Sequence, residues 1–243
     1  MTNRFKSLKK ILFICGFSLI IWSCKKEAAL EVSDYEYKSD KTALIEVNIQ
    51  TITGKTEVAN SINQELCNFV CTSFYIDASK DKQNKIEDCA NQFNSSYSNF
   101  KSQFSSELSQ ELSKWEAFVD GELTCQNELL LSFAMSSSIN TGGSKPITKV
   151  QFLNFDRNNG KPLVFNDLVS NKTELLNVMK SYLEQELFSS TLKIEEFTTN
   201  NVLNIPDHFG YNDLGIVAFY ETQTNNFIEF SIPFNKVEGY LKY

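Results

Sequence analysis

The sequence is poor in the residues that most often build catalytic and metal sites. Its single histidine, His208, excludes a site with several imidazole ligands and leaves one possible imidazole base. It contains no nucleophile elbow of the G-x-S-x-G type, no P-loop and no dinucleotide-binding fingerprint. We therefore expect no catalytic residue of these types, no metal ion and no cofactor. The sequence favours a non-catalytic protein.

Carboxylates are the remaining catalytic candidates. Acidic residues stand close together in three places, namely Glu184 and Glu186, Glu195 and Glu196, and Asp207 and Asp213. Most such pairs face solvent, and a glycosidase pair requires a defined separation that the sequence does not give. His208 lies in a segment expected to be a loop, where a lone histidine is usually structural. A carboxylate-dependent hydrolase acting on wall or host glycan is the alternative function.

The chain also lacks a hydrophobic run long enough for a transmembrane helix. Its apolar stretch, residues 11–22, has 12 residues, whereas a membrane span needs about 20. Four basic residues precede that stretch, which is the layout of a secretory signal. Ile21, Trp22 and Ser23 resemble a lipobox in front of Cys24. We predict a lipoprotein signal peptide at 1–23, cleavage before Cys24, and lipidation of the Cys24 thiol.

The residues after Cys24 bear on location. Residues 24–42 are expected to be the lipidated cysteine and a flexible tether, because residues 29–40 are polar with few large apolar side chains. Lys25, Lys26 and Glu27 resemble the charged signal that sends Bacteroidota-type lipoproteins to the outer face of the outer membrane. Retention on the periplasmic face stays an alternative. The prediction is a lipid-anchored protein of the cell envelope, at the outer membrane.

Positive charge is scarce once the signal peptide is removed. That segment holds four of the 23 basic residues and none of the 30 acidic residues. The mature part therefore has 19 basic against 30 acidic residues, a net charge of −11. Nucleic acid is excluded as an expected partner, because its phosphates require a basic surface. An acidic surface can instead attract a basic protein.

The sequence has no C-x-x-C pair, which argues against a four-thiolate zinc site. Besides Cys24 the mature part has four cysteines, Cys67, Cys71, Cys89 and Cys125, and an even number in an exported chain favours two disulfides. Cys67 and Cys71 are four residues apart on one face of a predicted helix, so each should pair with a different element. Three connectivities are possible. Our preferred one joins Cys71 to Cys89 and Cys67 to Cys125.

The hydrophobic pattern predicts an α+β fold, with antiparallel sheets, helices packed on one face, and two sub-domains. In the first sub-domain, residues 43–145, we expect a strand over 45–49, a helix containing Cys67, a long helix over 86–118, and a strand over 129–135. The loop 140–146 is expected to divide the halves.

In the second sub-domain, residues 146–243, a strand ending near Asp156 should turn at Asn159 and Gly160 into a strand over 162–165. A helix follows, opened by Asn171 and Glu174 as a capping box. Two closing strands are expected around 216–220 and 228–232, and Asn235 is expected to cap a final helical turn.

The order of elements and short motifs resembles the RsiV-like extracytoplasmic domain family. The motifs are Ile62 and Asn63, the Thr-Gly-Gly loop at 141–143, Asn154 to Asp156, Gly160 and Lys161, Asp167 and Leu168, and Ile232 to Phe234 before Tyr240 and Leu241. The resemblance covers 43–243. Its first part is similar to the N-terminal domain associated with PdaC-type deacetylases, and its second to the RsiV-like C-terminal domain.

The resemblance implies binding. The outer module of the anti-sigma members recognises lysozyme, and the same module precedes the catalytic domain of PdaC-type peptidoglycan deacetylases. It implies a lysozyme-like protein or peptidoglycan as partner. The ligand-binding candidates are Thr141, Gly142, Gly143 and Lys145, although the two glycines have a simpler explanation in a tight connection that needs positive φ.

Overall fold

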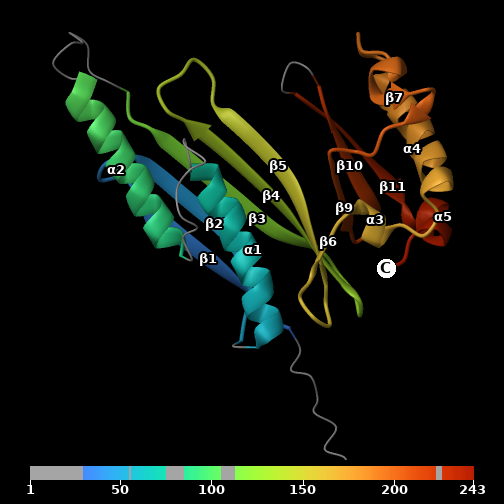
Figure 1. The fold of residues 1–243 in the computed structure, drawn as a ribbon, viewed down its shortest axis with the longest axis horizontal. Coiled ribbons are helices and arrows are strands. Elements are labelled where there is room, and N and C mark those ends of the chain that lie inside the picture. The colour runs from blue at the N-terminus through green and yellow to red at the C-terminus, as the bar shows by residue number, and fades with distance from the viewer. Residues whose placement is uncertain (1–29, 55, 75–84, 105–112, 223–225) are drawn as a thin grey trace, which may run out of the picture.

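The structure, a computed structural model, describes residues 30–54, 56–74, 85–104, 113–222 and 226–243. Its main feature is a six-stranded sheet whose strands follow chain order (Figure 1). They are β1 (Val32–Ser39), β2 (Leu44–Ile52), β3 (Glu116–Gln126), β4 (Leu130–Asn140), β5 (Ile147–Asp156) and β6 (Pro162–Leu163). Neighbouring strands are antiparallel except β2 and β3, which run parallel. A parallel pair requires a crossover, and the helices between β2 and β3 provide it.

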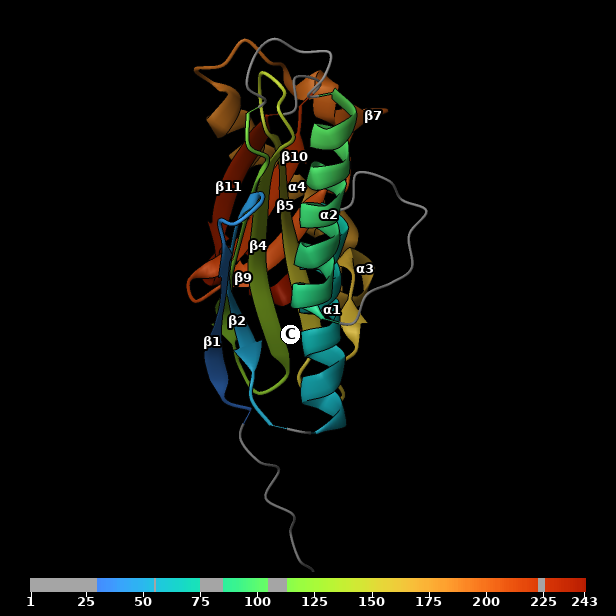
Figure 2. The same ribbon diagram turned by 90° about the vertical axis from the view of Figure 1, so that its left-hand side faces the viewer.

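Helices α1 (Glu57–Phe74) and α2 (Ile86–Phe104) cover one face of this sheet (Figure 2). Ile45, Val47 and Ile49 of β2 are buried at every second position, as a strand with one covered face requires. Helix α1 presents Ile62, Leu66 and its other buried residues at helical spacing toward them. Together these residues form the first hydrophobic cluster.

The second half contains a three-stranded antiparallel sheet in the order β11, β10, β9, formed by β9 (His208–Asn212), β10 (Gly215–Glu221) and β11 (Phe227–Pro233). Helix α4 (Lys172–Leu187) buries five apolar side chains in a second hydrophobic cluster. The smaller elements are α3 (Phe165–Leu168), η1 (Ile194–Phe197), β7 (Thr198–Thr199), β8 (Val202–Leu203), α5 (Phe234–Val237) and η2 (Glu238–Tyr240). The α+β prediction is confirmed.

Helix α4 begins where the sequence predicts. The Asn171 side-chain oxygen accepts a hydrogen bond from the backbone N–H of Glu174 at 3.3 Å. This satisfies one of the free donors of the first helical turn. Helix α5 differs from the prediction, because its N-cap is Pro233 and Asn235 lies inside the helix. The fixed φ of proline suits that start, so no side-chain cap is needed.

The two halves are joined by side chains of the large sheet that bind the edge strand β9. Asn154 donates from Nδ2 to the Phe209 carbonyl at 2.8 Å, and the Thr124 hydroxyl donates to the Tyr211 carbonyl at 2.7 Å. Ser132 Oγ accepts from the Tyr211 N–H at 3.1 Å and itself donates to Asn154 at 2.8 Å. The outward backbone N–H and C=O groups of an edge strand have no partner within the sheet. In β9 these side chains form hydrogen bonds with them, as a neighbouring strand otherwise would.

The predicted tether is wrong in its second half. Residues 24–29 lie outside the described residues, but residues 32–39 form β1, paired with β2 along its whole length. Tyr35 and Tyr37 of β1 pack against the first hydrophobic cluster. The aromatic rings at alternating positions therefore give β1 an apolar face. The prediction of a tether counted few large apolar residues in this segment and did not consider these two tyrosines.

The predicted helix over 86–118 is also wrong at its end. Among the described residues, α2 ends at Phe104 and β3 begins at Glu116. Trp115 is buried against the rings of Phe93, Tyr97 and Phe100, with centroids 5.3 to 5.5 Å apart. Trp115 was predicted to be the last residue of the aromatic stripe of this helix. It instead lies just before β3 and packs on the aromatic residues of α2 through tertiary contact.

The loop 140–146 does not divide the halves. It connects β4 to β5, which are antiparallel neighbours in one sheet, so the predicted boundary at 145/146 falls inside that sheet. Phe155 of β5 is fully buried and packs on Phe133 of β4, with ring centroids 6.1 Å apart. Residues up to 163 thus complete the first sheet before the second half begins.

Candidate functional site

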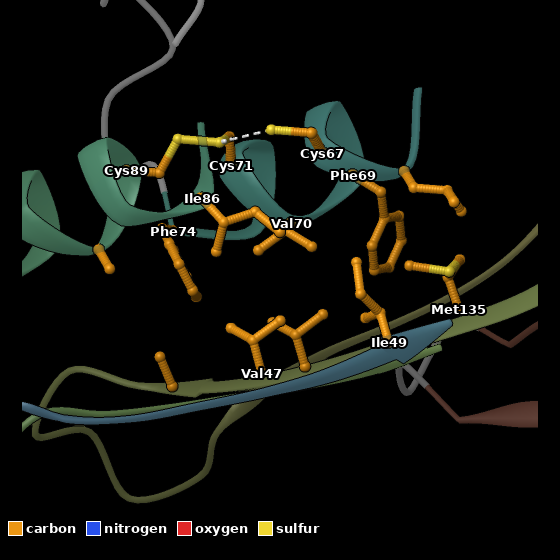
Figure 3. Packing of buried hydrophobic residues seen from close by; sticks show 14 of the residues in the cluster. Val47, Ile49, Cys67, Phe69, Val70, Cys71, Phe74, Ile86, Cys89 and Met135 are labelled. Carbon is orange, nitrogen blue, oxygen red and sulfur yellow. Dashed lines mark hydrogen bonds between the residues drawn. A yellow bond between two sulfur atoms is a disulfide. The ribbon is translucent and has the colours of Figure 1, made fainter. Parts of the chain in front are cut away.

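One of the two predicted disulfides is confirmed. Cys71 of α1 is bonded to Cys89 of α2, with Cα atoms 5.3 Å apart (Figure 3). The predicted pairing of Cys67 with Cys125 is wrong, because both are buried free thiols in different hydrophobic clusters. The strand register of β3 shifts between Leu123 and Cys125. This β-bulge turns Cys125 to the face away from the helices, where it cannot reach Cys67.

A polar groove of about 760 Å³ lies between α2 and the end of β1 with its turn into β2. Residues 37–42 form one wall, and the exposed face of α2 forms the other. The α2 residues that line the groove all carry amides or hydroxyls, namely Asn91, Asn94, Ser95, Ser98 and Asn99. The opposite face of α2 buries Cys89, Phe93 and Tyr97 against the sheet. The amphipathic pattern of the helix therefore places a row of short polar side chains along the groove.

Hydrogen bonds hold the two walls together and leave other polar groups available. The backbone N–H of Ala43 donates to Asn94 Oδ1 at 2.9 Å, and Lys114 Nζ donates to the Asp40 carbonyl. In the part of the chain that the structure describes, the side-chain amides of Asn91 and Asn99 make no hydrogen bond to another residue. Each amide offers both donors and an acceptor to a ligand.

Lysines surround this groove. Lys38 and Lys41 line it, and an adjoining hollow of about 500 Å³, which shares Lys41, Thr42 and Ser98 with the groove, is lined by Lys101 and Lys114 as well. Among the described residues, the one ion pair within 4.0 Å joins His208 to Glu221, so these lysines form none. Asp40 also lines the groove, and Lys38 pairs across the strands with Glu46. Lysines still outnumber carboxylates in the lining of the groove and the adjoining hollow, which favours a ligand that carries negative charge.

The predicted ligand-binding loop lies at the end of the β4–β5 hairpin, on different elements from the groove. Gly142 adopts φ +91° and donates from its N–H to Asn140 Oδ1 at 2.9 Å. Gly143 and Lys145 are exposed, and Thr141 is half-buried. The Asn140 contact and the positive φ at Gly142 are what a tight hairpin connection requires. They explain Gly142 without a ligand, whereas a ligand role for Thr141, Gly143 and Lys145 stays a prediction.

Several motif residues behind the family resemblance have structural roles. Asn63 of α1 bonds both backbone groups of Ile52, at 2.8 and 2.7 Å, and so fixes the helix to the end of β2. Gly160 has φ +69°, and its carbonyl accepts from the Ser61 hydroxyl at 3.0 Å. The Asp167 carboxylate accepts from the Val164 N–H at 3.1 Å. These residues position α1, the β5–β6 turn and α3.

His208 lies at the junction of the halves, in a pocket of about 300 Å³ that Glu65, Asp207 and several aromatic residues also line. Its Nε2 is 3.2 Å from Glu221 Oε1. The Asp207 carboxylate accepts from the backbone N–H of Glu221 at 2.7 Å. Both side chains thus tie the start of β9 to the end of β10, a structural use of the lone histidine. The expectation of a loop is wrong for His208, because it is the first residue of β9. The other predicted acidic pairs, at 184 and 186 and at 195 and 196, are exposed.

The face of the large sheet opposite the helices is rich in carboxylates near β1, β2 and β3. Strand alternation and register place Asp34, Glu36, Glu46, Asp120 and Glu122 on this face. Gln50 donates to Asp34 at 3.3 Å and Asn48 donates to Asp120 at 3.4 Å, which confirms that these residues share it. The molecule therefore presents an acidic sheet face and a lysine-rimmed groove.

Sequence reasoning missed the groove. Its signal was the run from Asn91 to Asn99, in which every position off the apolar stripe is asparagine, glutamine or serine and none is charged. Solvated helix faces usually carry charged residues, so that composition is unusual. The other wall lies about fifty residues earlier, and it could not be joined to α2 without the fold.

The described residues thus form an α+β module with two hydrophobic clusters and a polar groove. Among the described residues no cluster of His, Cys, Asp and Glu could hold a metal ion. Within the same residues no helix has the length and hydropathy to cross a membrane.

The particular relatives follow from comparison with known proteins. Residues 35–148 match the family described as Deacetylase PdaC. The fold is similar to a DUF3298 family member from Bacteroides fragilis, with a TM-score of 0.59 and 16% identity over 88% of this chain and 94% of that one. A DUF3298 family protein from Pseudomonas aeruginosa gives 0.52 and 17%, over 89% and 96%. At such identities the likeness shows the fold alone. No curated protein matches the chain.

Proposed function

We propose that this protein is an envelope-anchored lipoprotein whose folded part is a non-catalytic binding module for cell-wall glycan. The observation that carries the proposal is the groove between α2 and residues 37–42, lined by asparagine and serine side chains with lysines around it. Its volume of about 760 Å³ lies within the range of small-ligand sites. Its lining is polar where such sites are usually apolar, which favours a hydroxyl-rich ligand.

The chemistry of the groove suits a wall glycan. Sugar hydroxyl and acetamido groups donate and accept hydrogen bonds, and the amides of Asn91 and Asn99, which have no partner among the described residues, can match both. The half-buried ring of Tyr37 adds an apolar surface for the carbon face of a sugar ring. Carboxylates of wall peptides would meet Lys38 and Lys41. A cationic protein would meet repulsion at this place.

Two further arguments support the cell-wall setting. The match of residues 35–148 carries the name of a deacetylase. The RsiV-like and PdaC-type resemblance of the sequence implies a module that stands before the catalytic domain of peptidoglycan deacetylases. A module that binds glycan would hold its chain against the wall in either context. Lipidation at Cys24 would place this one at a membrane facing the wall.

Sedimentation with insoluble peptidoglycan tests the proposal. The full-length protein, purified in detergent, should pellet with the wall material. The double variant Asn91→Ala with Asn99→Ala should bind about 30-fold more weakly, because it loses two hydrogen bonds worth about 1 kcal/mol each. Asn177→Ala, an exposed amide on α4, is the matched control and should bind like the parent. A parent protein that stays in the supernatant would contradict the proposal, and release of soluble fragments would favour the hydrolase.

A second candidate function rests on the acidic sheet face. A basic, lysozyme-like protein would be attracted to Asp34, Glu36, Glu46, Asp120 and Glu122. Lysozyme binding should then weaken as salt rises, and Asp120→Asn with Glu122→Gln should weaken it further. The same variant should leave wall binding unchanged. Lysozyme binding that depends on Asn91 and Asn99 would assign the groove to a protein partner instead.

Anchoring is tested separately. Because acylation requires the Cys24 thiol, Cys24→Ala should abolish incorporation of labelled lipid and release the protein from membranes. Cys125→Ala, which removes a buried thiol, should keep both properties. Unchanged lipid labelling of Cys24→Ala would remove this part of the proposal.

A further inference from the structure

Three cysteines come together where α1 meets the start of α2. The Cys71–Cys89 disulfide joins the helices, and the free thiol sulfur of Cys67 lies 3.9 Å from Cys71 Sγ. Figure 3 shows the three sulfur atoms in a row, with that of Cys71 in the middle. A thiolate attacks a disulfide in line with the bond that breaks. In this view Cys67 lies on the far side of Cys71 from Cys89, which is the side from which an attacking sulfur approaches.

We infer that Cys67, Cys71 and Cys89 form an intramolecular thiol–disulfide exchange site. The Cys67 thiol loses its proton to solvent, and its sulfur forms a bond to Cys71 Sγ. The Cys71–Cys89 bond breaks, and Cys89 leaves as a thiolate that takes up a proton. One disulfide is exchanged for another, so the step requires neither an oxidant nor a reductant.

Helix geometry sets what the product requires. Residues four apart in an α-helix have Cα atoms about 6 Å apart and side chains on one face, within the Cα separations of about 4.4 to 6.8 Å that disulfides accept. Their Cβ atoms are about 5 to 6 Å apart, whereas a disulfide needs about 3.5 to 4.5 Å, so a Cys67–Cys71 bridge requires the turn of α1 between them to distort. Cys89 lies in the first turn of α2, a position that favours a thiolate, but its side chain is fully buried and its own N–H is bonded to the Lys85 carbonyl at 3.3 Å. Burial opposes the thiolate, so Cys89 must take up a proton as it leaves.

The surroundings keep the exchange slow at neutral pH. Cys67 is only 9% exposed, and burial, followed by the charges of Glu87 and Asp88, raises the pKa of its thiol. From β1 the Tyr35 hydroxyl also faces this place and donates to Glu87 Oε1 at 3.0 Å. The reactive thiolate is therefore scarce near pH 7, and exchange should accelerate as the pH rises.

The exchange would change how the helices are held together. The Cys71–Cys89 bond ties α1 to α2, whereas a Cys67–Cys71 bond would lie within α1 alone. The first turn of α2 would lose its covalent link to the rest of the first half. Since α2 carries Asn91 and its neighbours, the step would loosen one wall of the groove. The exchange chemistry itself does not depend on the proposed glycan function.

Mapping the free thiols of the full-length protein tests the inference. The protein, purified without reductant, is held at pH 7 or pH 9, quenched with acid, denatured, alkylated and digested. At pH 7 the alkyl label should be on Cys67 and Cys125. At pH 9 at least about a tenth of the molecules should carry it on Cys89 in place of Cys67. Cys67→Ser should abolish labelling of Cys89, and Cys125→Ser should leave it unchanged. Cys89 that stays unlabelled at pH 9 would overturn the inference.

A second variant tests the product directly. In a glutathione buffer of oxidising ratio, Cys89→Ser should form a disulfide between Cys67 and Cys71, seen as one bridged peptide. Recovery of both residues as alkylated thiols would overturn the inference. If Cys89→Ser does not fold, the pH experiment on the parent protein decides alone.

Discussion

The two halves of the molecule are stabilised in different ways. The first half closes its core with two long helices, a wide sheet and a disulfide between α1 and α2. The second half has a three-stranded sheet and one long helix, and none of its described residues forms a disulfide. Its edge strand β9 is held by Thr124, Ser132 and Asn154 of the first half. The second half therefore depends on the first for the hydrogen bonds of β9, whereas the first half is held together mainly by its own hydrophobic core.

The largest effect should follow loss of the disulfide. Replacing Cys71 and Cys89 together by serine removes a bridge over 18 residues, worth about 3 kcal/mol in the chain-entropy model. The expected result is a melting temperature lower by several degrees or more, with faster amide hydrogen exchange in α1 and α2 than in α4. Cys125→Ser is the control for loss of a buried sulfur. Equal acceleration in both halves would contradict the separation between them.

A somewhat smaller effect should come from forcing the halves apart. A Cβ atom on Gly210 would lie 2.0 Å from the Phe152 ring, so Gly210→Ala must shift β9 or that ring. Overpacking of this kind costs about 1 to 3 kcal/mol. Amide exchange should rise first in β9, β10 and β11, while α1 keeps its protection. Gly239→Ala meets nothing within 4 Å and should be neutral. A Gly210→Ala protein as stable as the parent would show that the halves are not closely packed.

The smallest effect distinguishes two buried tyrosines of the second half. Tyr220 donates its hydroxyl to the Asn204 carbonyl at 2.7 Å, whereas the Tyr211 hydroxyl has no hydrogen-bond partner among the described residues. Tyr220→Phe should therefore lower the free energy of unfolding by about 1 kcal/mol. Tyr211→Phe should leave it unchanged or raise it, because it removes a buried polar group without a partner. Denaturant titration measures both, and equal losses would mean that Tyr211 has a partner.

The sequence predicted those elements whose signals are local. The alternation at 45–49, the helical spacing around Cys67 and the Asn171 cap all lie in elements of the predicted type. Effects that depend on tertiary structure were missed. The bulge after Leu123 reverses the face of Cys125. Trp115 continues the aromatic spacing of α2 in the sequence, but it lies just before β3 and packs on α2 through tertiary contact.

The candidate site was less predictable than the fold. One wall of the groove is the turn at 40–43, and the other is α2, which lies in the crossover between the parallel strands β2 and β3. The alternation of residues predicts strands but not their order in the sheet, so the sequence could not place these two walls together. The loop 141–145 was chosen as a connection between two halves, but it joins two strands of one sheet, and hairpin geometry accounts for Gly142. The helix face from Asn91 to Asn99 gave a compositional signal, but its significance depends on the wall opposite.

The central claim is that α2 and the β1–β2 turn bind wall glycan, and a titration observed by NMR tests it most directly. Soluble, uncross-linked peptidoglycan fragments are added to the uniformly labelled protein, and the side-chain amide resonances of asparagine are followed. Binding at the groove should give saturable chemical-shift changes at the side-chain amides of Asn91 and Asn99, with the amide of Asn177 on α4 unchanged. Shifts confined to the 140–146 loop, or no shifts up to millimolar fragment, would contradict it.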